Sequence, residues 1–305
     1  MSARPLIGVD LGGTKVEAAV IEPDGTVLWR AREATPPGDY DGTIAAVAGL
    51  VRRARAQAPK AHGVGLGHPG SSSSVTGLHR NANSTCLNGR PLLADLERVL
   101  GMPVRGANDA NCLALSEAID GAGKGARTVF GVILGTGCGG GVVVDRRVLE
   151  GANGIAGEWG HMPLPGATAA ELGMSCWCGR RACLEMFLSG PGVEADHARH
   201  GGERAIRLPR IAWLAQSGDP CASATITRWI DRLGRALGAV CNILDPDAIV
   251  LGGGASLVPG LPERLPSAIA PHCFSDRFIT PVRRALHGDS SGVRGAAWLF
   301  ATFPA

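Results

Sequence analysis

The first hundred residues alternate short apolar runs with glycine-rich turns, a pattern that predicts strands followed by a helix. Apolar runs at 6–9, 16–21 and 26–29 each have the length of a strand, and a glycine-rich hairpin joins the first two. Within 39–59 the apolar positions recur every three or four residues, which predicts a helix. The short run at 64–66 then predicts a buried strand.

A second apolar series repeats this opening pattern. An apolar helical run begins at Asp109, whose side chain we expect to cap the helix N-terminus. The apolar run 128–134 then enters the glycine-rich segment 135–141, and the chain leaves it through the valines of 142–144. Strand, glycine-rich hairpin and strand thus occur twice. The repeat predicts two related halves, joined near residues 115–125.

The second half carries a cysteine-rich insertion at 161–183 before its helices begin. A long amphipathic helix is predicted over 226–240, a strand over 248–251 and a last strand near 278–282. A terminal helix is predicted within 290–305. Alternating strands and helices of this kind indicate an α/β protein.

Composition narrows the class of protein. The chain has 305 residues, and its 45 glycines show no Gly-X-Y period, which excludes a collagen-like protein. A net charge of +3 gives no electrostatic footprint for nucleic acid, and no apolar run reaches the length of a membrane span. The nine cysteines, without an export signal, favour reduced thiols or metal ligands. We therefore expect a cytoplasmic protein without nucleic-acid or membrane partners.

The glycine-rich segments indicate phosphate binding without a dinucleotide fold. Gly135 to Gly140 formally match G-x-G-x-x-G, but valines follow where a Rossmann motif requires a helix. No Walker A loop occurs. Glycines at a hairpin tip let backbone N–H groups approach phosphate oxygens, so two tips and the cluster 252–254 are suited to enclose a nucleotide. The alternative is that each tip is only a tight turn, as we expect for most other glycines.

The cysteine cluster has the spacing of a metal site. Cys176, Cys178 and Cys183 follow His161, and three thiolates with one imidazole complete a closed tetrahedral zinc shell of the structural kind. The alternative is three unconnected cysteines. The remaining six show no ligand spacing and are expected to be packing residues: Cys86, Cys112, Cys138, Cys221, Cys241 and Cys273.

Carboxylates accompany each of these motifs. Asp10 adjoins the first glycine tip, and Glu158 and Glu185 flank the cysteine cluster. Each is individually explained by solvation or helix capping, but together with Asp109 they are what a polar cleft between two lobes requires. A serine hydrolase is excluded, because no acidic residue or histidine follows Ser290 of the motif G-x-S-x-G.

Seven segments resemble, in order, the motifs of the ROK family of sugar kinases and, within it, the bacterial manno(fructo)kinase type. They are 10–15, 82–89, 107–112, 134–161, the cysteine cluster, 242–247 and 252–254. The resemblance covers essentially the whole chain. Gly140 departs from it, because close relatives often have alanine there, and we expect a slightly looser glycine tip.

The resemblance implies an α/β, actin-like (ribonuclease H-like) fold of two lobes with ATP and sugar in the cleft between them. By this analogy the N-terminal lobe comprises residues 1–118 with 290–305, and the C-terminal lobe comprises 119–289. Asp109 resembles the general base that accepts the proton of the sugar hydroxyl. His161 would place one ring nitrogen on zinc and direct the other at the sugar.

The resemblance assigns the remaining site residues as well. The implied sugar ligands are Asn83, Asn108, Glu158, His161 and Glu185. The implied ATP and Mg²⁺ site consists of Asp10, Gly12, Gly13, Thr14, Lys15, Thr136, Gly137, Gly253 and Gly254. The implied structural zinc ligands are His161, Cys176, Cys178 and Cys183.

The expected activity is ATP-dependent phosphorylation of a hexose at its 6-hydroxyl. D-fructose is the favoured substrate, with mannose or glucose also considered. A glucokinase or an N-acetylhexosamine kinase is the alternative. The family also includes sugar-responsive repressors, but these carry a DNA-binding domain before the first glycine motif, where nine residues precede Asp10 here. A homodimer is expected by the same analogy.

Overall fold

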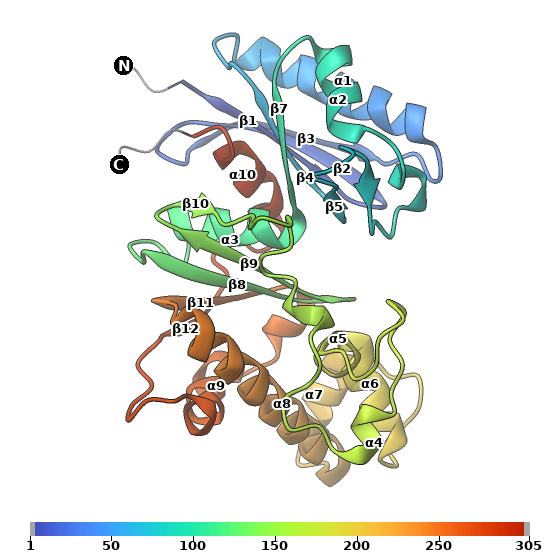
Figure 1. Cartoon of the computed structure of the whole chain (residues 1–305), viewed down its shortest axis with the longest axis vertical. Helices are drawn as coiled ribbons and strands as arrows, with labels where there is room; N and C mark the ends of the chain where they lie inside the picture. The colour runs from blue at the N-terminus through green and yellow to red at the C-terminus, as the bar shows by residue number, and fades with distance from the viewer. Residues whose placement is uncertain (1–3, 302–305) are drawn as a thin grey trace.

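A computed structural model of the chain describes residues 4–301 (Figure 1). Its first half forms a five-stranded sheet in the order β3-β2-β1-β4-β7. The first three strands are antiparallel neighbours, and β4 and β7 run parallel to β1. The strands are β1 (Leu6–Leu11), β2 (Lys15–Ile21), β3 (Val27–Ala34), β4 (Val64–His68) and β7 (Val104–Asn108).

The second half repeats the same pairing. Its sheet has the order β10-β9-β8-β11-β12, in which β8 and β9 are antiparallel and β11 and β12 run parallel to β8. The strands are β8 (Thr128–Leu134), β9 (Cys138–Val144), β10 (Arg147–Val148), β11 (Ala248–Gly252) and β12 (Val282–Arg284). The predicted internal repeat is therefore confirmed at the level of topology.

Two helices lie between the sheets. Helix α3 (Asp109–Ile119) packs on β8 and β9, and helix α10 (Ser291–Trp298) packs on β1 and β4, while the two helices also pack on each other (Figure 1). Each half of the chain thus contributes one helix to the layer between the two sheets. Helices α1 (Tyr40–Gln57) and α2 (Leu92–Leu100) cover the outer face of the first sheet. Helices α8 (Pro220–Leu244) and α9 (Leu261–Ile269) cover the second.

Glycines in the strands let these middle helices lie close to the sheets. A Cβ added to Gly65 would lie 1.7 Å from the carbonyl oxygen of Ala296 in α10, and one on Gly141 would lie 2.5 Å from that of Ala110 in α3. No real Cβ tolerates such distances. Part of the glycine excess therefore serves helix packing, a role that the expectation of simple turns missed.

The segment after β10 carries short elements that lead to α8. They are η2 (Trp159–His161), α4 (Ala169–Leu172), α5 (Glu185–Leu188), α6 (Gly190–Arg199) and α7 (Leu208–Gln216). The other short elements are β5 (Ser71–Ser72), β6 (His79–Arg80), η1 (Thr85–Leu87), η3 (Gly254–Leu257), η4 (Ala270–His272) and η5 (Gly288–Ser290). Within residues 4–301, no helix combines the length and the apolar character that crossing a bilayer demands.

Three sequence predictions need correction. The second glycine tip spans 135–137, because the glycines at 139–141 belong to β9. Gly140 accordingly does not loosen a tip: it lies in the strand, where an added Cβ would be 2.8 Å from the indole of Trp159. The last strand begins at Val282, not 278, because Pro281 cannot donate a ladder hydrogen bond.

The division into lobes at 118 and 290 stays a prediction. Helix α3 packs on strands of both sheets, and α10 shares one apolar cluster with β8, β9 and β11, so neither belongs to one sheet alone. The ends of the predicted N-terminal lobe, 1–3 and 302–305, lie outside the described residues.

Candidate active site

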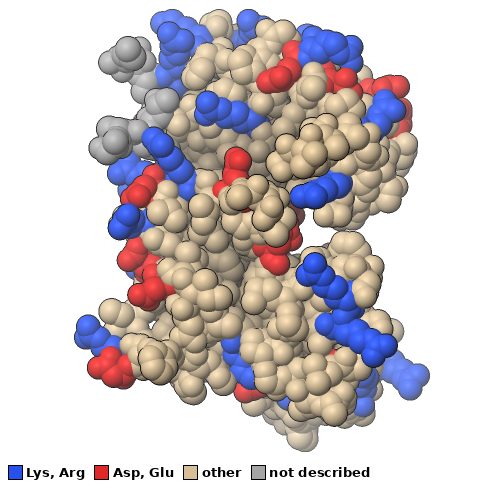
Figure 2. Space-filling model, in the orientation of Figure 1, with Lys and Arg blue, Asp and Glu red and all other residues tan. Residues whose placement is uncertain are grey.

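Three polar residues lie side by side where β1, β4 and β7 end. Asp10 of β1 pairs with Gly67 of β4, and the next residue, His68, pairs with Asn108 of β7. Carboxyl ends of parallel strands share one edge of a sheet, and ligands of open α/β sheets bind there. The molecule is notched between its two halves in the space-filling view (Figure 2).

Asn108, and not Asp109, caps helix α3. The side-chain oxygen of Asn108 accepts a hydrogen bond from the N–H of Asn111 at 2.7 Å, and Asp109 is the first helical residue. The prediction of Asp109 as the cap was wrong, because the extended backbone of a cap occurs one residue earlier. Asp109 is thereby available for other contacts.

The carboxylate of Asp109 is open to solvent on one side and surrounded by protein atoms on the others. This loss of surrounding water raises the pKa of Asp109, and the hydrogen bond from the N–H of Ala110, 2.9 Å long, offsets part of the effect. A carboxyl group with a raised pKa is a better proton acceptor than an ordinary aspartate.

Asp10 occupies the same recess. Burial raises the pKa of Asp10 to about 6, with a further contribution from the negative charge of Asp109. A Cβ added to Gly292, at the start of α10, would lie 2.7 Å from the Asp10 carboxylate. A buried carboxylate whose pKa is raised further by a neighbouring negative charge forms a site whose charge a cation would relieve.

Four of the five predicted sugar ligands lie close to one another and to Asp109, with Glu158 at their centre. Burial raises the pKa of Glu158, as do the negative charges of Asp109 and Glu185. The charge of His161 and a hydrogen bond from Asn108 act in the opposite direction. Residues from β7, α3, η2 and α5 are therefore close enough to interact electrostatically, although they span 78 positions from Asn108 to Glu185 in the sequence.

Glu185 links this group to the second glycine tip. Its Oε2 accepts a hydrogen bond from the N–H of Cys138 at 3.1 Å, and a Cβ on Gly137 would lie 2.8 Å from the same oxygen. Thr136 at the tip is exposed. Gly253 packs against the strand before the tip, since its φ is +79° and an added Cβ would lie 2.4 Å from the carbonyl oxygen of Leu134.

The first glycine tip is built by backbone contacts. The N–H of Gly12 donates to the carbonyl of Lys15 at 2.9 Å, and the hydroxyl of Thr35 donates to the carbonyl of Gly12 at 2.8 Å. Gly13 and Thr14 between them are exposed. Their backbone groups are thus accessible from solvent.

Asn83 is not part of the convergent group among the contacts of the described residues. It is exposed, and its side-chain oxygen accepts from the N–H of Ser84 at 3.0 Å. Ser84 itself approaches the first tip, where a Cβ on Gly13 would lie 3.3 Å from its hydroxyl. The structure therefore places Asn83 beside the first glycine tip.

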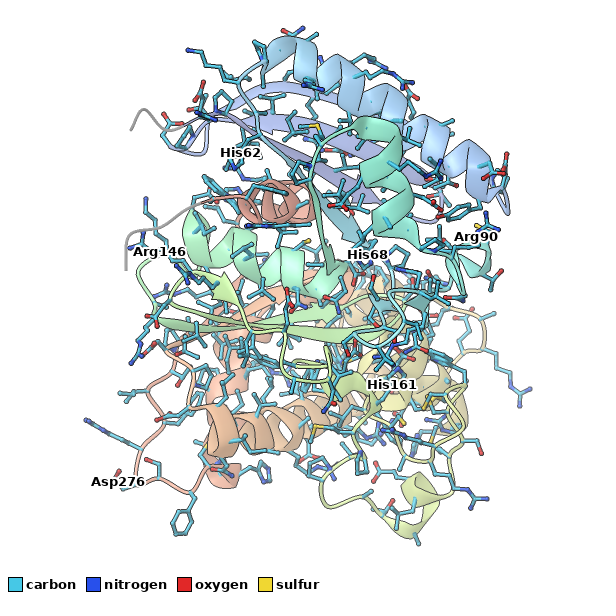
Figure 3. All side chains as sticks on the ribbon, turned by 45° about the horizontal axis from the view of Figure 1, so that its top comes forward. His62, His68, Arg90, Arg146, His161 and Asp276 are labelled. Carbon is cyan, nitrogen blue, oxygen red and sulfur yellow. The ribbon has the colours of Figure 1, made fainter. Side chains whose placement is uncertain are left out.

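The four predicted zinc ligands form one cluster. Their ligand atoms all lie within 4.8 Å of one another, and the sulfur atoms lie close to His161 (Figure 3). The Sγ atoms of Cys178 and Cys183 are 3.6 Å apart, and Cys176 Sγ is 3.8 Å from His161 Nδ1. A tetrahedron around zinc has edges of about 3.5–3.8 Å, as follows from Zn–S and Zn–N distances of about 2.3 and 2.0 Å.

The chemistry of the cluster agrees with its geometry. Burial raises the pKa of Cys176 and Cys183, so thiolates at these positions need a cation nearby. The donor set fits zinc. Of the other six cysteines, Cys112, Cys138 and Cys241 are buried as expected, whereas Cys86, Cys221 and Cys273 are partly exposed.

Trp177 is a site residue that the sequence reading missed. Its indole N–H donates to Glu185 Oε1 at 2.5 Å, and its ring meets that of His161 edge-on with 5.1 Å between centroids. The side chain is 69% exposed. The sequence could have indicated Trp177, because a residue between the predicted ligands Cys176 and Cys178 must lie beside the metal site.

A cavity of about 840 Å³ shares Asn108 with this site. Its lining includes His68, Asn108 and Arg105, but neither Asp10 nor Asp109. The cavity is therefore distinct from the recess in which the carboxylates meet.

Comparison with known proteins gives the family. The model of the ROK family matches residues 6–302. N-acetyl-D-glucosamine kinase of Haemophilus influenzae (strain 86-028NP) is 40% identical over 301 residues, which cover 97% of this chain and 99% of that protein. The ROK hexokinase of Thermus thermophilus has a TM-score of 0.85 at 33% identity, covering 97% of both chains.

A ROK family glucokinase from Streptomyces griseus, solved with glucose and AMPPNP, has a TM-score of 0.73 at 28% identity and covers 96% of this chain and 98% of its own. The predicted two-lobed, actin-like α/β fold is confirmed by these neighbours. The match over nearly the whole length shows that the chain belongs to the ROK family.

Proposed function

We propose that this protein is an ATP-dependent sugar kinase that phosphorylates the 6-hydroxyl of N-acetyl-D-glucosamine. The observation that carries the proposal is the convergence of Asn108, Asp109, His161 and Glu185 on Glu158, between two exposed glycine tips. Phosphoryl transfer requires mainly positioning and charge neutralisation, which such an arrangement can supply.

Asp109 is assigned the role of general base. It lies in the recess with Asn108 and Glu158, whose side chains would bind sugar hydroxyls. Its raised pKa suits it to take the proton of the attacking hydroxyl, a contribution of about 10²–10⁴ in rate. If the two lobes close over the notch, water would be excluded and hydrolysis of ATP suppressed.

Asp10 is assigned to the metal–nucleotide side. Carboxylate oxygens are the ligands that Mg²⁺ prefers, and burial raises the pKa of Asp10, so a bound cation would stabilise its charged form. Bound Mg²⁺ would neutralise charge on the phosphates. The backbone of Gly12, Gly13 and Thr14 and that of Thr136 and Gly137 are suited to hold the phosphates, with Lys15 beside the first tip. Gly253 and Gly254 would adjoin the adenosine.

The choice of sugar follows the curated relatives and departs from the sequence expectation. D-fructose was favoured from the motifs, but the 40% identity to an N-acetyl-D-glucosamine kinase supports the N-acetylhexosamine alternative. Glucose is the second candidate, because a hexokinase and a glucokinase share the fold at 33% and 28% identity. No comparison reported above favours fructose.

Zinc would be structural. The cluster of His161, Cys176, Cys178 and Cys183 leaves no ligand position for a catalytic water once all four bind. Nδ1 of His161 lies next to Cys176 and would bind zinc, so its Nε2 would be available for a hydrogen bond to the sugar. A homodimer and a cytoplasmic location stay predictions, the first testable by light scattering during size-exclusion chromatography.

One assay separates these alternatives. ADP release is measured in a coupled assay with N-acetylglucosamine, N-acetylmannosamine, glucose, mannose and fructose, each with wild type and with Asp109→Asn as the inactive control. The highest kcat/KM is expected with N-acetylglucosamine. A higher value with glucose or fructose would overturn the substrate assignment, and no stimulation by any sugar would favour a binding or regulatory role.

A further inference from the structure

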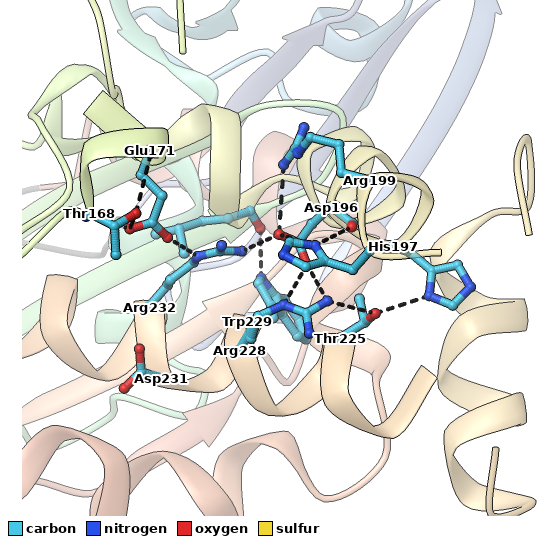
Figure 4. Close-up of polar contacts among 12 residues, drawn as sticks. Thr168, Glu171, Asp196, His197, Arg199, Thr225, Arg228, Trp229, Asp231 and Arg232 are labelled. Carbon is cyan, nitrogen blue, oxygen red and sulfur yellow. Dashed lines mark hydrogen bonds and ion pairs between the residues drawn. The ribbon is translucent and has the colours of Figure 1, made fainter. Parts of the chain in front are cut away.

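Arg232 of α8 is a buried arginine that joins two carboxylates from two other helices. Its Nε donates to Oε1 of Glu171 in α4, and its Nη1 donates to Oδ1 of Asp196 in α6, each at 2.9 Å (Figure 4). Its side chain is 6% exposed. The planar guanidinium can bind both partners at once, which a lysine cannot reproduce.

Glu171 stands at the centre of residues 162–183, which we call the cysteine loop. Its Oε2 accepts from the N–H of Thr168 at 2.9 Å in a capping box, and its carbonyl accepts from the N–H of Met174 at 3.1 Å. Ala182 in turn donates to the carbonyl of Met174 at 2.8 Å. A short chain of bonds therefore runs from Arg232 to the backbone that carries the cysteines.

The same face of α8 supports the helix that begins with Glu185. The guanidinium of Arg232 lies 5.2 Å from the ring centroid of Phe187, and the indole N–H of Trp229 donates to the carbonyl of Leu188 at 3.1 Å. Both partners belong to α5. Arg232 thus contacts both the segment that carries the cysteines, through Glu171, and the helix that carries Glu185, through Phe187.

The charges around Arg232 are matched. Burial raises the pKa of Glu171 and of Asp196, but hydrogen bonds outweigh it and hold both pKa values below normal: Thr168 and Arg232 act on Glu171, and Arg228 and Arg232 on Asp196. Loss of Arg232 would leave Asp196 with Arg228, which binds it at 2.8 Å, but would deprive Glu171 of its arginine. Arg228 is therefore a natural control.

We propose that Arg232 is a positioning residue for the metal cluster and the sugar ligands. It holds the cysteine loop through Glu171 and the Glu185 helix through Phe187, and so sets the distance between them. The effects on sugar and on zinc rest on the proposed function, whereas the effect on the cysteine loop does not.

The first experiment compares Arg232→Lys with Arg228→Lys. Both substitutions shorten an arginine that binds Asp196, but only Arg232 also binds Glu171. Hydrogen exchange measured by mass spectrometry should quicken about tenfold or more in the cysteine loop of Arg232→Lys and stay near wild type there in Arg228→Lys. Equal exchange in the two variants would overturn the proposal.

The second experiment measures metal and substrate. Zinc release to a chelator should be about 10-fold faster in Arg232→Lys, as is typical when a supporting contact of a metal ligand is lost. KM for the sugar should rise by a similar factor while KM for ATP stays within about threefold. A purely structural role would lower Tm and leave zinc release and the sugar KM unchanged.

Glu171→Gln provides an independent route to the same contact. Glutamine can maintain the cap of α4 but loses the ion pair with Arg232. It should quicken exchange in the cysteine loop as Arg232→Lys does, and the two effects should not add in the double variant. Additive effects would contradict the proposed link. Hydrogen exchange needs no substrate, so it tests Arg232 even if the kinase assay fails.

Discussion

The indole N–H of Trp177 donates a hydrogen bond to the carboxylate of Glu185 across 2.5 Å, and the other oxygen of that carboxylate accepts from the N–H of Cys138. One carboxylate thereby connects the cysteine loop with the second glycine tip. Because the Trp177 ring also meets His161, the metal cluster, the sugar ligands and the phosphate tip form one continuous group of contacts.

Replacing Trp177 with Phe should therefore weaken sugar binding. Phenylalanine keeps a ring against His161 but cannot donate to Glu185, which then keeps the hydrogen bond from Cys138 and loses the one from the indole. We expect KM for the sugar to rise about 10-fold, the equivalent of a charge-assisted hydrogen bond of about 1.4 kcal/mol, with zinc content unchanged. Trp213→Phe on α7, another exposed tryptophan, is the matched control. Equal KM values in the two variants would refute the role of this contact.

Asp109→Asn should abolish turnover without unfolding the protein. The amide preserves shape and can still accept from the N–H of Ala110, but it cannot take a proton. We expect kcat to fall about 10²–10⁴-fold, with the dissociation constants of sugar and ATP and the zinc content near wild type. Steady-state kinetics and calorimetry measure these quantities. Asp145→Asn, in an exposed turn, serves as control. Near-normal kcat in Asp109→Asn would exclude it as the base.

Asp10→Asn should stabilise the ligand-free protein at neutral pH although it impairs use of Mg²⁺–ATP. Burial raises the pKa of Asp10 from 3.8 to about 6 in the folded chain. Between these values the folded state binds more protons than the unfolded state, so it loses stability as pH rises through them. The gain in Tm should be largest above pH 6 and shrink toward pH 4. A gain independent of pH in thermal melts would contradict the raised pKa.

Metal analysis of the purified protein should find about one equivalent of zinc. Cys178→Ser should lower the zinc content, Tm and activity together, because metal binding contributes to folding free energy. Cys221→Ser, outside the cluster, is the control and should retain the metal. A fully active, metal-free protein would show that the four residues do not hold zinc.

Local patterns predicted the elements well because strand and helix periods depend on neighbouring residues. Strands β1 to β4, β8, β9 and β11, the long helix now seen as α8 and the repeated strand–hairpin–strand unit follow from apolar spacing, whereas the short strands β7 and β10 were not predicted. The errors arose where adjacent residues, or two kinds of local structure, are equally compatible with the sequence. Asn108 and Asp109 are both good caps, and only the path of β7 into α3 decides between them. Glycines 139–141 suit both a turn and a strand, and helix α3 requires the strand.

The sequence alone determined which chemistry is available: the glycine tips, the carboxylates and the three cysteines with His161 are recognisable by type and spacing. Only the tertiary structure decided which of them meet. It brought Glu185 to Trp177 and Gly137, left Asn83 beside the first tip, and placed Arg232 behind the cysteine loop. The reason is physical: spacing governs contacts within one element, whereas contacts between elements depend on how sheets and helices pack.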